Sequence, residues 1–169
     1  HIPKNASSYV KGCLIHAGWQ HYDSLQRTDN YLIVLRDPEE RWLSGLAEYQ
    51  SNLGQFNLNL QDIFDRITFD DHTDLQLYFL SMFDELPFNQ ITFLKCDADL
   101  DKNLNKFLTE NGYPTGTYHA PIINASTGPK LQIKENLKKV LDTHPDYRDR
   151  IRQHFADDYK LYNSVTFYD

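Results

Sequence analysis

The stretch Tyr31-Leu-Ile-Val-Leu35-Arg36-Asp37-Pro38-Glu39-Glu40 decides the fold class of this chain. Its first five residues are apolar and partly β-branched, which indicates a buried parallel strand. The strand ends at a turn in which Asp37 is suited to cap a helix and Pro38 to be its first residue. Glu40 stands where a capping box needs its acidic partner. A strand that passes directly into a helix is the basic unit of an α/β fold.

The same alternation extends to both sides of this unit. Residues 1–3 resemble the end of a strand that we expect to begin upstream of His1, and the helix that Pro38 opens should run to about Gln50. A second complete strand is predicted at 90–95, and further helices at 8–16, 60–67, 74–82, 97–111, 130–142 and 145–162. This order predicts one α/β domain over residues 1–169, with a small parallel sheet, right-handed crossovers and flanking helices.

Composition excludes several classes of function. The 169 residues carry a formal net charge of −7, whereas a general nucleic-acid binder would show a basic face. No apolar stretch approaches the ~18 residues that a membrane-spanning helix needs. The two cysteines lack the spacing of a zinc site, so we expect no metal.

The segment His1-Ile-Pro-Lys4-Asn5-Ala6-Ser7-Ser8 lies between the first predicted strand and the first predicted helix. Small residues at such a position let an anion approach free backbone N–H groups at the positive end of the helix dipole. Lys4 adds a full charge, and Ser7 or Ser8 is expected to cap the helix. The segment therefore predicts either a phosphate-binding loop or a plain strand–helix turn.

A second candidate motif follows the strand at 31–35. Arg36 stands at its carboxyl end, the edge at which open α/β sheets bind ligands, and its guanidinium suits phosphate. Ser44 lies on the following helix, on the same face as Arg41. The alternative is a surface arginine before a well-capped helix. Two such motifs at neighbouring strand ends favour a ligand with two anionic groups.

Together these motifs resemble the sulfotransferases that use 3′-phosphoadenosine-5′-phosphosulfate (PAPS), and the carbohydrate branch most closely. The first motif is similar to that family's 5′-phosphosulfate loop, and the second to its 3′-phosphate motif. The resemblance implies a P-loop-like three-layer α/β fold and PAPS as the donor. It also implies the residues that bind PAPS: Lys4, Asn5, Ala6, Ser7, Ser8, Arg36 and Ser44.

Weaker likeness continues along the chain, at His72-Thr-Asp-Leu-Gln76, at 119–126 and at 147–162. The resemblance implies that the loop at 119–126 approaches PAPS, with Asn124 and Ser126 closing over its 3′-phosphate. Ordinary turn chemistry explains those two residues equally well.

Sulfonyl transfer to an alcohol needs positive charge on the leaving phosphate and a base for the acceptor hydroxyl. Lys4 is the expected source of the charge. His72 is the first choice for the base because Asp70 and Asp71 precede it and would stabilise its charged form. His16 and Glu48 are the main alternatives, and the remaining candidates are His21, Asp71 and His119.

We expect the acceptor to be a small molecule or a glycan. The competing predictions are a non-catalytic nucleotide- or glycan-binding module and a P-loop phosphotransferase, although the Gly-Lys-Ser/Thr loop of the latter is missing. Glycosylation sequons begin at Asn5 and Asn124, and glycans there would block the predicted site. A bacterial or viral cytoplasmic enzyme is therefore favoured over one in a secretory lumen.

Overall fold

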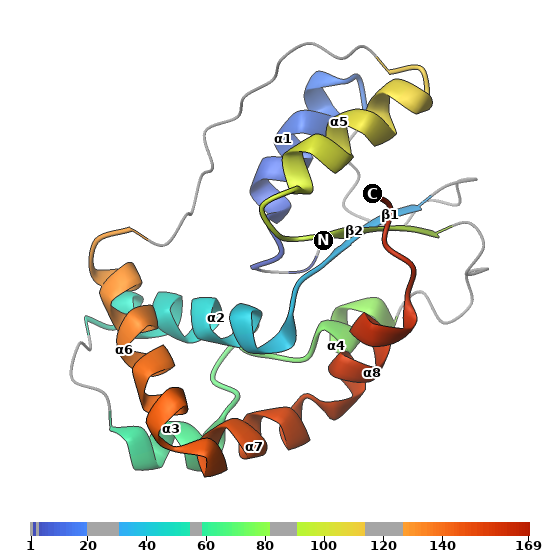
Figure 1. Ribbon diagram of the computed structural model, residues 1–169. Helices are drawn as coiled ribbons and strands as arrows, with labels where there is room; N and C mark the ends of the chain where they lie inside the picture. The colour runs from blue at the N-terminus through green and yellow to red at the C-terminus, as the bar shows by residue number, and fades with distance from the viewer. Residues whose placement is uncertain (1, 3, 20–30, 55–58, 82–90, 114–126) are drawn as a thin grey trace.

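The computed structural model describes residues 2, 4–19, 31–54, 59–81, 91–113 and 127–169 (Figure 1). The protein is a mixed α/β structure that is mostly helical. Its sheet is formed by β1 (Tyr31–Leu35) and β2 (Ile91–Lys95), which pair in parallel with Tyr31 opposite Ile91 and Leu35 opposite Lys95. Both strands and their parallel pairing confirm the sequence prediction.

Eight helices are described: α1 (Ser7–His16), α2 (Pro38–Asn52), α3 (Leu60–Arg66), α4 (Gln76–Leu80), α5 (Leu100–Glu110), α6 (Pro129–Thr143), α7 (Pro145–His154) and α8 (Ala156–Ser164). The start of α2 confirms the predicted cap, because Asp37 Oδ1 accepts a hydrogen bond from Glu40 N at 3.0 Å. Arg36 therefore lies between the last residue of β1 and the cap of α2. Among the described helices, none is long and apolar enough to cross a bilayer.

The sheet has helices on both faces (Figure 1). On one face, Val34 and Leu94 form a core with α1 and α5. On the other, Ile33, Leu35 and Phe93 pack with side chains of α4 and α8. This alternation follows from the period of two along a strand. A separate core around Trp42 joins α2, α3, α6 and α7.

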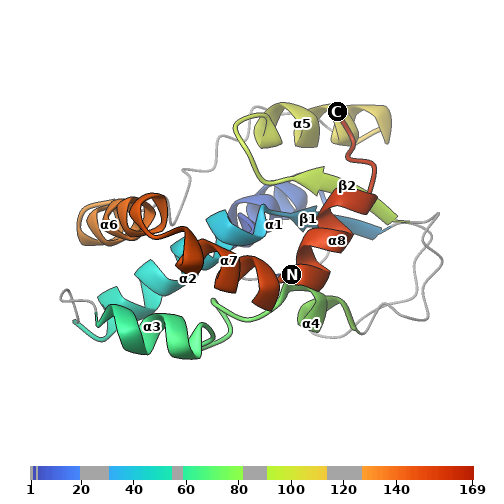
Figure 2. The ribbon, with the colours of Figure 1, turned by 60° about the horizontal axis from the view of Figure 1, so that its bottom comes forward.

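The prediction of one continuous helix over 145–162 was wrong, because the chain bends at Phe155 between α7 and α8. Phe155 is buried in the core around Trp42, whereas Leu161 packs against the sheet. The bend thus lets neighbouring segments reach two different cores. Figure 2 shows α7 and α8 leading from the helical end of the molecule towards β2.

Candidate functional site

The loop before α1 has an unusual backbone. Lys4 and Ala6 both have positive φ angles, of 65° and 54°, although neither is glycine. Such left-handed residues cost roughly 1–2 kcal/mol each and need support from the surrounding structure. Ala6 is the residue that precedes α1, and it has no side-chain cap to offer. The prediction that Ser7 or Ser8 would cap was wrong, because both lie inside the first turn of the helix.

Asn5 provides much of that support. Its side chain is buried, and Nδ2 donates hydrogen bonds to Val34 O at 2.8 Å and to Gln76 Oε1 at 2.7 Å. Reversing the amide would place its oxygen against the Val34 carbonyl, so these contacts fix its orientation. Asn5 Oδ1 is buried and has no hydrogen-bond partner among the described residues. The structure therefore uses the Asn5 amide to fasten the loop to the end of β1.

Gln76 connects this loop to Arg36. Its Oε1 also accepts from Arg36 N at 3.1 Å, and its Nε2 donates to Arg36 O at 2.9 Å. Backbone N–H groups of Gln76 and Leu77 donate to the two carboxylate oxygens of Asp158 at 2.7 and 2.9 Å. We call Asn5, Arg36, Gln76 and Asp158 the Gln76 lock. It joins the loop, β1, α4 and α8.

Arg36 and Lys4 come together, as their positions in the sequence predicted. Arg36 Nη1 donates to Lys4 O at 3.0 Å, while Nη2 lies 3.8 Å from Glu40 Oε2. The contact is with the Lys4 backbone, because the Lys4 ammonium lies at Glu48 of α2. Arg36 thereby holds the backbone of the residue that carries the other predicted anion ligand.

Ser44 and Arg41 are both buried on α2. The Arg41 guanidinium donates to the carbonyl oxygens of Asp74 and, at 3.2 Å, Asp71. Burial lowers the pKa of Arg41 to about 10 against the opposing effect of Asp158 and Asp74, so it stays charged at neutral pH. Arg41 thus anchors the segment that carries His72.

His72 lies over the same helix. Its Nδ1 is 3.0 Å from Asp70 Oδ2, and its ring is partly exposed. A Cβ built on Gly45 would lie 2.1 Å from His72 O, so the His72 backbone can approach α2 only because this residue is glycine. Glu48 follows Gly45 on α2 by less than one helical turn, so it lies near the same contact.

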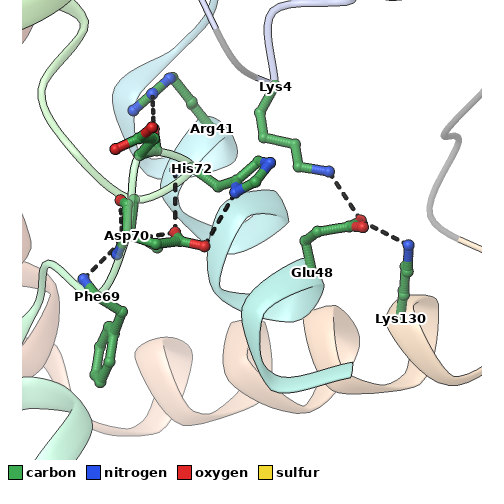
Figure 3. A network of polar contacts seen from close by, with 9 residues as sticks. Lys4, Arg41, Glu48, Phe69, Asp70, His72 and Lys130 are labelled. Atoms are coloured by element: carbon green, nitrogen blue, oxygen red, sulfur yellow. Dashed lines mark hydrogen bonds and ion pairs between the residues drawn. The ribbon is translucent and has the colours of Figure 1, made fainter. Parts of the chain in front are cut away.

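Glu48 joins two lysines that are distant in the sequence (Figure 3). Lys4 Nζ lies 2.9 Å and Lys130 Nζ 2.7 Å from the same oxygen, Glu48 Oε2. Burial alone would raise the pKa of Glu48, but hydrogen bonds from Lys130 and Lys4 and their charges lower it to about 2. Glu48 is therefore ionised and a very weak base at neutral pH.

A similar arrangement surrounds Glu40. Its carboxylate lies 2.8 Å from Lys134 Nζ and 2.5 Å from Lys138 Nζ. Although burial opposes them, these lysines lower the pKa of Glu40. Glu40 therefore does not complete the reciprocal half of the predicted capping box. We call Glu40, Glu48, Lys130, Lys134 and Lys138 the α2–α6 charged face.

The other predicted residues do not join this group. His16 is the last residue of α1, so roughly 13 Å of helix separates it from Ser7 beside the loop. Asn124 and Ser126 lie outside the described residues, as do His21 and His119. Within the described part of the chain, no group of three or more His, Cys, Asp or Glu side chains could hold a metal ion.

Sequence reasoning missed the roles of Gln76, Asp158 and Gly45. Gln76 stood in the His72-x-x-x-Gln76 segment, but nothing nearby indicated that it would be buried against Arg36. The available signal for Gly45 was a glycine in the middle of a strongly predicted helix, which usually has a packing reason.

Comparisons with known proteins assign this chain to no family. No protein-family model matches the chain, no curated protein matches it, and no solved structure matches it.

Proposed function

We propose that this protein is a sulfotransferase that moves the sulfonate group of PAPS to a hydroxyl acceptor, with a carbohydrate as the favoured acceptor. The observation that carries the proposal is the meeting of Lys4 and Arg36 at the carboxyl end of β1, where Arg36 Nη1 donates to Lys4 O. Lys4 would serve the 5′-phosphosulfate, and Arg36 with Ser44 the 3′-phosphate. The P-loop-like three-layer fold of the resembled family is part of the same proposal.

The residues present fit such a ligand. The N-terminus of α1 has no side-chain cap, so its dipole and N–H groups favour a bound anion. Lys4 already holds an anionic oxygen, that of Glu48. The unpartnered Asn5 Oδ1 adds an acceptor at the base of the loop, which a ligand hydroxyl or a water can satisfy.

In the transfer, the sulfur–oxygen bond to the 5′-phosphate breaks while a new bond forms between sulfur and the acceptor oxygen. Lys4 stabilises the negative charge that develops on the leaving phosphate. His72 accepts the acceptor's proton, because an Nδ1–H donated to Asp70 leaves Nε2 free to bind one. Glu48 is the weaker choice for this step because of its low pKa.

The donor is tested by thermal unfolding with 3′-phosphoadenosine-5′-phosphate (PAP) and, separately, with ATP and Mg²⁺. A ligand at 100 times its Kd should stabilise the protein by roughly 2.7 kcal/mol. Stabilisation by PAP but not by ATP is expected. The reverse result would favour a phosphotransferase and sink the proposal.

Catalysis is tested by sulfonate transfer to a panel of carbohydrate acceptors. Lys4→Ala should abolish transfer, whereas Lys11→Ala, which removes an exposed lysine from α1, should leave it unchanged. Arg36→Ala should mainly raise the KM for PAPS. PAP binding without transfer to any acceptor would favour a non-catalytic binding module.

A further inference from the structure

Two carboxylates of α2 each lie between cations that come from different parts of the chain. Glu48 joins Lys4 of the loop to Lys130 of α6. Glu40 lies between Arg36 at the end of β1 and the α6 residues Lys134 and Lys138. In both cases a residue predicted to bind phosphate faces lysine side chains of α6 across a carboxylate.

The Glu48 arrangement is the tighter one. Lys4 Nζ and Lys130 Nζ converge on a single oxygen, and the Lys4, Glu48 and Lys130 side chains are 13%, 17% and 30% exposed. Two ammonium groups around one oxyanion oxygen also form a binding arrangement for phosphate or sulfate. One carboxylate neutralises only one of these two charges. A doubly charged oxyanion would match both and make stronger interactions than Glu48 makes.

We propose that Lys130 is a second cationic ligand for the oxyanion that binds at Lys4, and that Glu48 occupies the position of this oxyanion in the ligand-free protein. The ligand class is a phosphate or sulfate group. The inference rests on the proposed function in taking the Lys4 loop as an anion site. Lys130 is the second residue of α6, whose N-terminus has no side-chain cap and adds its dipole to the same site.

A ligand must displace Glu48 to reach both lysines, so the carboxylate competes with it. Removing the charge of Glu48 should therefore strengthen anion binding, whereas removing either lysine should weaken it. A purely structural ion pair predicts a different result. In that case, Lys130→Ala and Glu48→Gln would both alter stability without opposite effects on an added anion.

The test is calorimetric titration of the full chain with inorganic pyrophosphate at low ionic strength. Lys130→Ala should weaken binding about tenfold, a loss of ~1.4 kcal/mol. Lys130→Arg should restore affinity to within about threefold, because it returns the charge. The matched control is Lys138→Ala, which removes a lysine from the same helix and the same charged face but leaves Glu48 untouched. It should bind within about twofold of the wild type.

Glu48→Gln is the second variant, and it keeps an oxygen that Lys4 and Lys130 can contact. It should bind pyrophosphate about tenfold more tightly than the wild type. Circular dichroism spectra and unfolding midpoints establish that each variant is folded before titration. Wild-type affinity in Lys130→Ala would overturn the inference. Weaker binding in Glu48→Gln, or no binding of pyrophosphate by the wild type, would do the same.

Titration with PAP separates this inference from the proposed function. If the pyrophosphate results hold but PAP binds no better than pyrophosphate, the oxyanion site stands and the proposed donor is wrong. If PAP binds tightly and Lys130→Ala leaves its affinity unchanged, the donor stands and the role of Lys130 is wrong.

Discussion

The Gln76 lock and the α2–α6 charged face both border the Lys4 loop, but they are built from different interactions. The lock consists of short hydrogen bonds around buried side chains, including those of Asn5, Gln76 and Asp158. The charged face consists of ion pairs whose side chains are partly exposed, such as Lys130 and Glu40. Buried bonds hold groups in one geometry, whereas partly exposed ion pairs contribute less to stability and are screened by salt. The lock therefore sets the shape of the loop before α1, and the charged face places lysine side chains of α6 beside the carboxylates of α2.

The largest expected effect comes from the lock. Asp158→Ala removes a buried carboxylate that accepts from two backbone N–H groups and helps to balance the charge of Arg41. Breaking a buried charged arrangement in this way should lower the free energy of unfolding by about 4 kcal/mol. Urea denaturation measures the loss. The neighbouring Asp157→Ala, at an exposed position, should change it by less than about 0.5 kcal/mol.

A smaller effect is expected where the His72 segment lies on α2. Gly45→Ala should destabilise by about 2 kcal/mol because the new methyl group meets His72 O. The direction of the stability change is informative, because a glycine-to-alanine change at an open helix position would stabilise the protein by about 1 kcal/mol. If His72 is the base, kcat should fall as well. A variant more stable than the wild type would contradict the close contact.

The charged face should make the free energy of unfolding depend on pH. The pKa of Glu48 falls from its ordinary value of 4.5 to about 2 on folding, so its contribution is fully present above pH 4.5. It is lost as the pH falls through 2. Glu48→Gln should abolish this part, about 1–2 kcal/mol after allowance for solvent screening. Urea unfolding from pH 6 to pH 2.5 measures this contribution. If the free energy of unfolding changed equally with pH in the wild type and in Glu48→Gln, the low pKa of Glu48 would be contradicted.

The smallest effect concerns the backbone of the loop. Ala6→Gly should relieve the positive φ angle at this residue, but it also gives the unfolded chain more freedom. The net gain should be below about 1 kcal/mol, measurable as a slightly higher unfolding midpoint. Ala17→Gly, whose φ is −74°, should be destabilising and serves as the control.

The parts of the structure that depend on local chemistry could be predicted. The strand at Tyr31–Leu35, the Asp37 cap and the Pro38 start follow from neighbouring residues. The structure brings Arg36 to the Lys4 backbone, but the strand predicted at 1–3 is not part of the described sheet, because Ile2 is in no strand and residues 1 and 3 lie outside the described residues.

Other features depend on contacts between distant segments, which no local pattern encodes. Glu48 meets Lys130 across 82 residues, and Gln76 meets Asp158 across the same separation. The left-handed Ala6 also escaped prediction, because alanine gives no sign of a positive φ angle and only the Asn5 contacts explain how it is held. Sequence reasoning named Glu48 as a candidate base and Glu40 as a capping residue, but it did not predict that both would pair with lysines of α6.

The Gln76 lock also has a consequence for the order of events during synthesis. The Asn5 amide is held by Gln76, which is made 71 residues later, and the Gln76 backbone is held by Asp158 of α8, which is made a further 82 residues later. We therefore expect the loop before α1 to stay unfastened on the ribosome until α8 has emerged. Pulse-labelled hydrogen exchange at the Gln76 and Leu77 amides would time this step, and protection before α8 has formed would contradict it.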